Sequence, residues 1–107
     1  MAGRRAKRIR AVKQVMVGFM GASTRFTGTL VDISRTGLLM RCPQDLPLET
    51  GGRIAIELGV DVLRSTVKVR RCVPDLGLAL EFIQMRPRDR ELLHRLLVHL
   101  ESVLTEA

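Results

Sequence analysis

The sequence predicts a mainly β protein, in which six short antiparallel strands form a closed barrel and one amphipathic helix follows at the C-terminus. Six short extended segments, separated by turn signals, occupy the region from residue 15 to residue 83, and many short strands in so few residues favour a barrel. The hydrophobic period then changes to that of a helix at Pro87. A chain of 107 residues has room for a single domain with a single core.

The predicted strands are recognised by alternation, or by apolar runs between turns. The clearest is 53–58, where apolar residues recur at every second position. In the segment 15–20 both alternating sets are largely apolar, which predicts a strand with little exposed face. Turn signals follow at 34–37, in the loop 43–52 and at Pro74-Asp75. The other predicted strands are 25–34, 38–42, 62–73 and 76–83.

The C-terminal segment 86–105 has the pattern of an amphipathic helix. Pro87 suits a first helical turn, and the acids Asp89 and Glu91 suit the positive end of the helix dipole. Leucines recur at helical spacing along one side. Packing of this stripe on the barrel is favoured over its presentation to a partner, and both remain open. The stripe consists of Leu93, Leu96, Leu97, Leu100 and Leu104.

Positive charge is concentrated at the N-terminus. The net charge is +7, and the first thirteen residues contain six basic residues and no acid, so the remainder is nearly neutral. The segment 1–13 is therefore predicted to be a flexible basic arm, followed by the barrel at 12–84 within the same domain. Such an arm suits an anionic partner: a nucleic acid, a phosphate-bearing ligand or anionic lipid. A secretory signal is disfavoured, because Gly18 and Gly21 interrupt the short apolar stretch that follows the arm.

Composition also argues against two other classes of site. No apolar run approaches the length of a membrane-spanning helix. Cys42 and Cys72 lack metal-ligand spacing, and His94 and His99 are five residues apart, on different sides of a helix. A metal site is not expected, and the cysteines are predicted to be small core residues.

Two short motifs are candidates for the site. Arg4 and Arg8 form an R-x-x-x-R pair in the arm, and Asp32, Ser34 and Gly37 form D-x-S-x-x-G in the predicted turn. Each has a structural alternative. Asp32 and Ser34 would satisfy backbone groups of the turn, Gly37 would provide a positive φ angle, and the arginines would lie in a solvated terminus.

The order of these two motifs, together with the predicted scaffold, resembles the PilZ domain family. The resemblance covers nearly the whole chain, and 76–82 (LGLALEF) is similar to the last strand of that family's split barrel. It implies a non-enzymatic receptor for the bacterial second messenger cyclic di-GMP, working in the cytoplasm with a downstream protein partner. Ala6 and Lys7 depart from the pattern, because family members often have an aromatic residue there.

The resemblance implies roles that suit the chemistry of this ligand. The guanidinium groups of Arg4, Arg5 and Arg8 match the O6 and N7 acceptors of guanine, its π face and the phosphates. The carboxylate of Asp32 accepts from the N1 and N2 donors of guanine, and Ser34 contacts base or phosphate. Gly37 permits close approach of the backbone. Ligand binding would then order the arm.

Three other functions are alternatives to the receptor. An enzyme is disfavoured, because arginine does not titrate and the motifs contain one carboxylate and no histidine or cysteine. A nucleic-acid-binding barrel suits the basic arm, but the chain has no Trp, no Tyr and three Phe for base stacking. A protein adaptor that works through the C-terminal helix, without ligand, is the third alternative.

Overall fold

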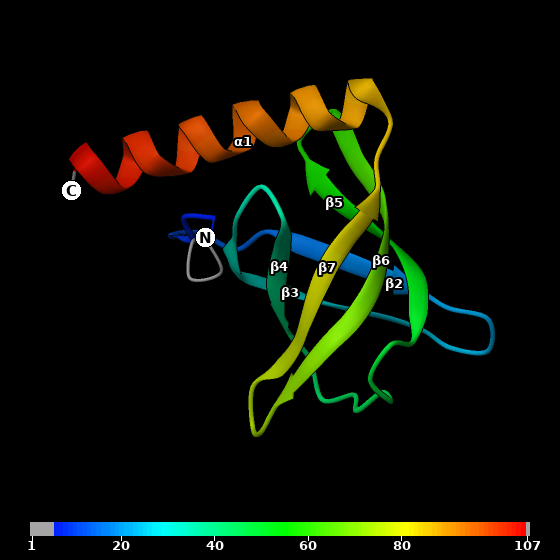
Figure 1. Ribbon diagram of the computed structural model, residues 1–107. Coiled ribbons are helices and arrows are strands. Elements are labelled where there is room, and N and C mark those ends of the chain that lie inside the picture. Colours follow the sequence, from blue (N-terminus) through cyan, green and yellow to red (C-terminus); the bar gives the residue numbers. More distant parts are fainter. Residues whose placement is uncertain (1–5, 107) are drawn as a thin grey trace.

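A single antiparallel sheet closes on itself, and one helix crosses an end of the resulting barrel (Figure 1). The computed structural model describes residues 6–106. Within that range the sheet has the strand order β1-β3-β2-β5-β6-β7-β4, and β3 also pairs with β4. The elements are β1 (Ile9–Arg10), β2 (Met16–Met20), β3 (Arg25–Ile33), β4 (Gly37–Arg41), β5 (Gly51–Leu58), β6 (Asp61–Val73), β7 (Gly77–Gln84) and α1 (Pro87–Glu106).

The pairing of β3 with both β2 and β4 closes the barrel, because β4 is also the partner of β7 at the other end of the sheet. The six longer strands, β2 to β7, therefore form the barrel, and β1 adds a short seventh strand to β3. The predicted six-stranded antiparallel barrel with a C-terminal helix is confirmed. The two-residue strand β1 was not predicted.

Alternation along the strands fills the barrel with apolar side chains. Val17 and Phe19 of β2, and Ile54 and Ile56 of β5, are at most 2% exposed and belong to one core. The prediction that β2 has little exposed face is wrong at Met20, which is 47% exposed. Two-residue alternation places Met20 on the outer face of the sheet, where apolar character does not imply burial.

Helix α1 packs its apolar stripe on the barrel. Leu93, Leu96 and Leu100 are buried, Leu97 is partly buried against the same core, and Leu92 adds a buried position that the predicted stripe omitted. The side chain of Leu104 lies outside the described residues. Core packing, the favoured alternative for this stripe, is what these leucines do. Within residues 6–106, no helix is long and apolar enough to span a membrane.

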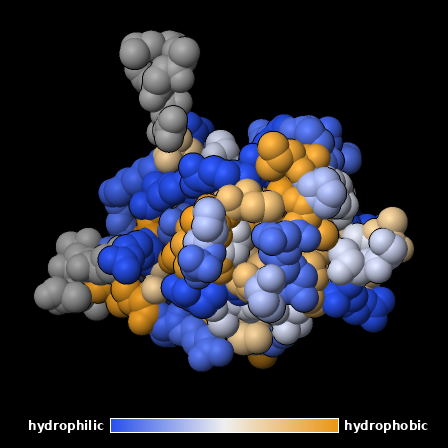
Figure 2. All heavy atoms as spheres, turned by 90° about the horizontal axis from the view of Figure 1, so that it is seen from below, coloured by the Kyte–Doolittle hydropathy of each residue, from blue (hydrophilic) through white to orange (hydrophobic). Residues whose placement is uncertain are grey.

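The beginning of α1 is fastened to the barrel by a buried carboxylate. Asp89 is 4% exposed, and its Oδ1 accepts a hydrogen bond of 2.9 Å from the backbone N–H of Arg64 in β6. The face of the barrel opposite α1 mixes hydrophilic and hydrophobic residues, and the hydrophobic ones form small separate patches (Figure 2). This face therefore offers separate side chains to a ligand rather than one large apolar surface.

Both cysteines are free and lie in or beside the core. Cys42 is buried, and burial raises the pKa of its thiol. Cys72 is partly buried, and its thiol donates a hydrogen bond of 3.2 Å to the carbonyl of Leu46. Their predicted role as small core residues agrees with these positions.

Alkylation is expected to distinguish the folded from the unfolded environment of Cys42. At pH 8, iodoacetamide should modify Cys42 at least about tenfold more slowly in the native chain than in urea, because the thiolate is the nucleophile and burial disfavours it. Mass spectrometry of the modified peptides over time measures both cysteines, with Cys72 as the less buried internal comparison. Equal rates for Cys42 in the two states would contradict its burial.

Candidate functional site

The turn between β3 and β4 is organised by the hydroxyl of Ser34. This residue is 1% exposed. Its Oγ accepts a hydrogen bond from the backbone N–H of Thr36 at 3.2 Å and lies 3.1 Å from Oγ1 of Thr36. Its backbone N–H donates to the carbonyl of Gly37 at 2.8 Å. Ser34 therefore satisfies turn groups, as its structural alternative predicted, and its contact with a ligand stays a prediction.

Gly37 is required here for close packing rather than for a left-handed backbone. The positive-φ residues among those described do not include it, so the expectation of a positive φ angle is wrong. Gly37 pairs with Glu81 of β7, and a Cβ on Gly37 would lie 2.3 Å from the carbonyl oxygen of Leu80. The absent side chain allows β4 and β7 to meet at the point where the turn enters the sheet.

A β-bulge in β3 turns Asp32 outward. Leu30 pairs with Met40 and Asp32 pairs with Leu39, so Val31 is an extra residue between the two pairs. The bulge shifts the alternation, which keeps both Leu30 and Ile33 in the core and leaves Asp32 on the outer surface. The Asp32 side chain is 19% exposed, enough for one carboxylate edge to meet a ligand.

Arg8 forms an ion pair with Asp32, which brings the two predicted motifs into contact. Its Nη1 donates to Oδ1 of Asp32 at 2.7 Å, across 24 positions of sequence. The Arg8 side chain is 47% exposed, so most of its guanidinium donors face solvent. Arg4 and Arg5, the other predicted arginines of the site, lie outside the described residues.

Ile9 is the one buried apolar residue in the described part of the arm, residues 6–13, and it holds this part beside the site. Ile9 is 5% exposed in the core, it pairs with Ile33, and Arg10 pairs with Asp32. Lys7 forms an ion pair with Glu101 of α1. The blue beginning of the described chain thus lies on the same side of the molecule as the β3–β4 turn and the C-terminal half of α1 (Figure 1). The one indication of this contact in the sequence is that Ile9 is an isolated large apolar residue within a run of basic residues.

A small apolar shelf lies next to Asp32 and was not predicted. Leu39 pairs with Asp32, Ala79 pairs with Leu39, and Arg71 pairs with Ala79, so the four residues form one row across β3, β4, β7 and β6. Leu39 and Ala79 are 9% and 7% exposed, yet they are not part of the core cluster. Their neighbours Leu38 and Leu78 point inward, so the shelf faces outward between an acid and an exposed arginine.

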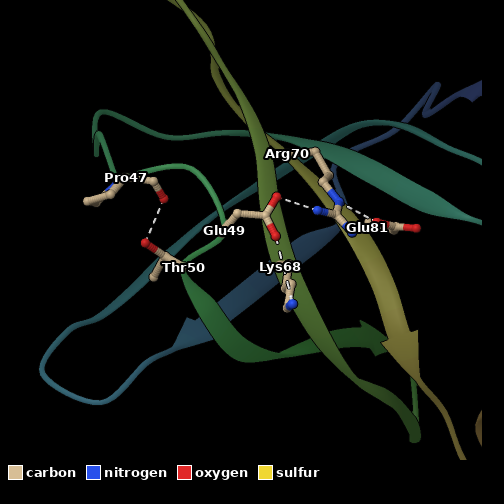
Figure 3. A network of polar contacts seen from close by, with 6 residues as sticks. All are labelled: Pro47, Glu49, Thr50, Lys68, Arg70 and Glu81. Carbon is tan, nitrogen blue, oxygen red and sulfur yellow. Dashed lines mark hydrogen bonds and ion pairs between the residues drawn. The ribbon is translucent and has the colours of Figure 1, made fainter.

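A network of charges borders the same region of the barrel. Arg70 bonds to Glu81, the cross-strand partner of Gly37, and also to Glu49, which lies 3.7 Å from Nζ of Lys68 (Figure 3). The hydrogen bonds that Arg70 donates to the carboxylates of Glu81 and Glu49 raise the pKa of Arg70. Arg70 thus forms ion pairs with two carboxylates, whereas Arg71 forms no ion pair within residues 6–106. The free cation beside the shelf is therefore Arg71.

The arrangement defines a small closed barrel with a basic terminal arm folded over an acidic residue, a design suited to holding a small anionic ligand against the outer wall. The sequence matches the PilZ domain family over residues 3–99, and the chain belongs to that family. PilZ domains are generally non-catalytic receptors for cyclic di-GMP.

Solved structures support the same fold. The PilZ domain of Escherichia coli YcgR with c-di-GMP superposes with a TM-score of 0.76 at 18% identity, covering 97% of this chain and 95% of that one. The PilZ domain of CeSA from a cellulose-synthesizing bacterium gives 0.70 at 24% identity, covering 90% and 99%. The Bacillus subtilis inhibitor of motility gives 0.70 at 16% identity, covering 90% of this chain and 51% of that one. No curated protein matches the chain significantly.

Proposed function

We propose that this chain is a receptor for cyclic di-GMP that binds the nucleotide between its arm and the β3–β4 turn and does not transform it. The observation that carries the proposal is the contact of Arg8 with Asp32, 2.7 Å between Nη1 and Oδ1. It brings the arginine of one motif to the carboxylate of the other on a solvent-facing wall. Membership of the PilZ family supports the ligand.

The two charged side chains are complementary to opposite edges of one guanine. The Asp32 carboxylate accepts from N1–H and N2–H, and the Arg8 guanidinium donates to O6 or N7, or stacks on the ring. Arg4 and Arg5 neutralise the two phosphates. The buried Ser34 fixes the turn through its hydroxyl, and the missing side chain of Gly37 lets the turn lie close against β7.

The shelf of Leu39 and Ala79 gives a base an apolar surface beside these donors and acceptors. A planar base beside this shelf would lie against the small exposed parts of Leu39 and Ala79, which are 9% and 7% exposed, and within reach of Asp32 on one side. Arg71, at the other end of the same row, is free to pair with a phosphate. The base is thus held by hydrogen bonds at its edge and by apolar contact at its face.

The signal passes from the ligand to the arm and from the arm to α1. Arg8 lies one residue from the buried Ile9 and one residue from Lys7, which pairs with Glu101 of the helix. When Arg8 moves to contact a ligand, the contact between the arm and the helix therefore changes. A downstream protein in the bacterial cytoplasm can bind to this changed surface. The receptor acts by this ordering and not by turnover.

Isothermal titration calorimetry tests the proposal directly. Cyclic di-GMP is expected to give a saturable heat, whereas GTP and a short DNA oligonucleotide give none. Arg8→Ala should weaken binding at least about tenfold, the equivalent of one charge-assisted hydrogen bond. The fold should be unaffected, since an exposed ion pair contributes about 1 kcal/mol or less.

Lys13→Ala is the matched control, because Lys13 is another exposed basic residue, at the end of the arm and outside both motifs. It should leave affinity within about twofold, as expected for a screened surface charge. A silent titration with cyclic di-GMP, combined with salt-sensitive binding of DNA, would replace the proposal with a nucleic-acid-binding barrel. Silence with every ligand would favour a protein adaptor.

A further inference from the structure

A hollow lies on the far side of the molecule from the β3–β4 turn. It has a volume of about 1090 Å³ and lies on the outer wall of the barrel, where β2 ends and α1 begins. In Figure 1 the β2–β3 loop and the yellow beginning of α1 mark this side, opposite the blue arm. Its rim is basic. The principal lining residues are Met20, Arg25, Arg53, Arg64, Arg86 and Arg88.

Sheet register explains why these arginines converge. Met20 of β2 pairs with Arg25 of β3 on one side and with Arg53 of β5 on the other. Adjacent strands are about 4.8 Å apart, so the two arginines flank Met20 at about 10 Å from each other. Arg64 pairs with Ala55, two residues along β5 from Arg53, and so projects from the same face one step away.

Most of this positive charge is uncompensated. Arg88 lies 3.5 Å from Asp61 and 3.6 Å from Asp89, and the Oδ1 of Asp89 also accepts the backbone N–H of Arg64. Arg25 contacts the sulfur of Met20 at 3.8 Å. No ion pair among the described residues includes the side chain of Arg25, Arg53, Arg64 or Arg86.

The floor of the hollow is kept low by small residues. Gly18 and Ala55 are cross-strand partners and lie between the arginines. A Cβ on Gly18 would meet only the carbonyl oxygen of Ala55, at 3.9 Å, which is ordinary contact. Packing within the chain therefore does not require a glycine at this position. Its effect is to leave space between cations.

We propose that this arginine-rimmed hollow is a docking site for an extended acidic segment of a partner protein. Carboxylates two residues apart on an extended strand are about 6.6 Å apart, close to the spacing of arginines on neighbouring strands of one face. Arginine forks bind carboxylates bidentately. Exposed Met20, between Arg25 and Arg53, adds the apolar contact typical of protein interfaces, in which arginine and methionine are enriched.

Two other polyanions fit the hollow less well. A single-stranded nucleic acid needs exposed aromatic faces, but the aromatic rim residue Phe26 is already stacked on Phe19 with ring centroids 5.0 Å apart. An anionic membrane is best met by protruding apolar side chains, and this surface is recessed. The hollow and the nucleotide site lie on opposite sides, so a partner docked here leaves the Arg8 and Asp32 face open. The inference does not depend on cyclic di-GMP binding.

NMR titration of the ¹⁵N-labelled chain with a ten-residue peptide of alternating glutamate and serine tests the inference. The amide signals of Gly18, Ala55 and Thr66 are expected to shift. The double variant Arg53→Glu, Arg64→Glu should weaken binding at least tenfold. Gly18→Val should weaken it as much without any change of charge, because it fills the floor. Arg41→Glu, an exposed reversal in another strand, should change affinity less than twofold.

Two results would overturn the inference. Unaltered affinity in Gly18→Val, with its melting temperature retained, would show that the peptide is attracted by diffuse charge and not by the hollow. Displacement of the peptide from these same amides by an RNA oligonucleotide of equal charge, or by phosphatidylglycerol vesicles, would assign the surface to nucleic acid or to membrane. Loss of binding in both the charge and the Gly18 variants, with neither competitor effective, supports the acidic segment.

Discussion

Replacing Asp32 by alanine is expected to lower the affinity for cyclic di-GMP at least about 100-fold. In the proposed site the carboxylate accepts hydrogen bonds from two donors of one guanine. Each charge-assisted hydrogen bond contributes about 1.5 to 3 kcal/mol, so their joint loss exceeds the roughly 2.7 kcal/mol that corresponds to 100-fold. Asp32 also positions Arg8, at 2.7 Å, so the variant weakens both edges of the base site. Calorimetry with cyclic di-GMP measures the change.

Asp32→Asn distinguishes the effect of the carboxylate charge on binding from the effect of the side-chain shape, because asparagine has nearly the same shape and no charge. The amide oxygen still accepts one hydrogen bond, so binding should be weakened by about tenfold, between wild type and Asp32→Ala. Thermal unfolding provides the control for folding, because the Asp32 and Arg8 pair is partly exposed and its loss costs about 1 kcal/mol or less. Wild-type affinity in Asp32→Ala would remove Asp32 from the site and leave the turn with a purely structural role.

The sequence was sufficient to predict the barrel because its inner positions repeat at the period of a strand. Ile54 and Ile56 alternate with polar or small residues, and the structure buries both. The same rule did not indicate which set of β2 residues faces outward, since both sets are apolar. Met20 lies outside because register, which depends on the partner strands, decides the face.

The candidate site was predictable as a pair of motifs but not as a surface. Arg8 and Asp32 were singled out by their order, and the structure places them in contact. The shelf of Leu39 and Ala79 was not foreseen, because it arises where β4 and β7 pair, and two apolar residues inside apolar strands look like core. The bulge at Val31, which turns Asp32 outward, likewise leaves no mark in a single sequence.

Ile9 illustrates how a tertiary contact overrides composition. A run of basic residues predicts a solvated arm, yet burial of one isoleucine, with Ala11 donating to the carbonyl of Val31 at 3.0 Å, gives the end of the arm a fixed path along β3. Arg8 is consequently held beside Asp32, with 2.7 Å between Nη1 and Oδ1.

Gly77→Ala is expected to produce the largest loss of stability of any alanine substitution at a glycine in this barrel. A Cβ at this position would lie 1.8 Å from the carbonyl oxygen of Met40 and 3.0 Å from the backbone nitrogen of Cys42. Both neighbours are backbone, so no side-chain rotation relieves the clash, and β4 must separate from β7. We expect a cost of about 3 kcal/mol or more, and a fall in melting temperature of about 12 °C or more.

Gly18→Ala is the matched control, because it places the same methyl group in another strand, where its nearest contact is the carbonyl oxygen of Ala55 at 3.9 Å. It should leave stability unchanged or raise it by about 0.5 to 1 kcal/mol, the usual advantage of alanine over glycine within a strand. Thermal unfolding followed by circular dichroism compares the two variants. If Gly77→Ala melts at the wild-type temperature, β4 and β7 do not approach as closely as their register requires, and the closure of the barrel at that pair would have to be revised.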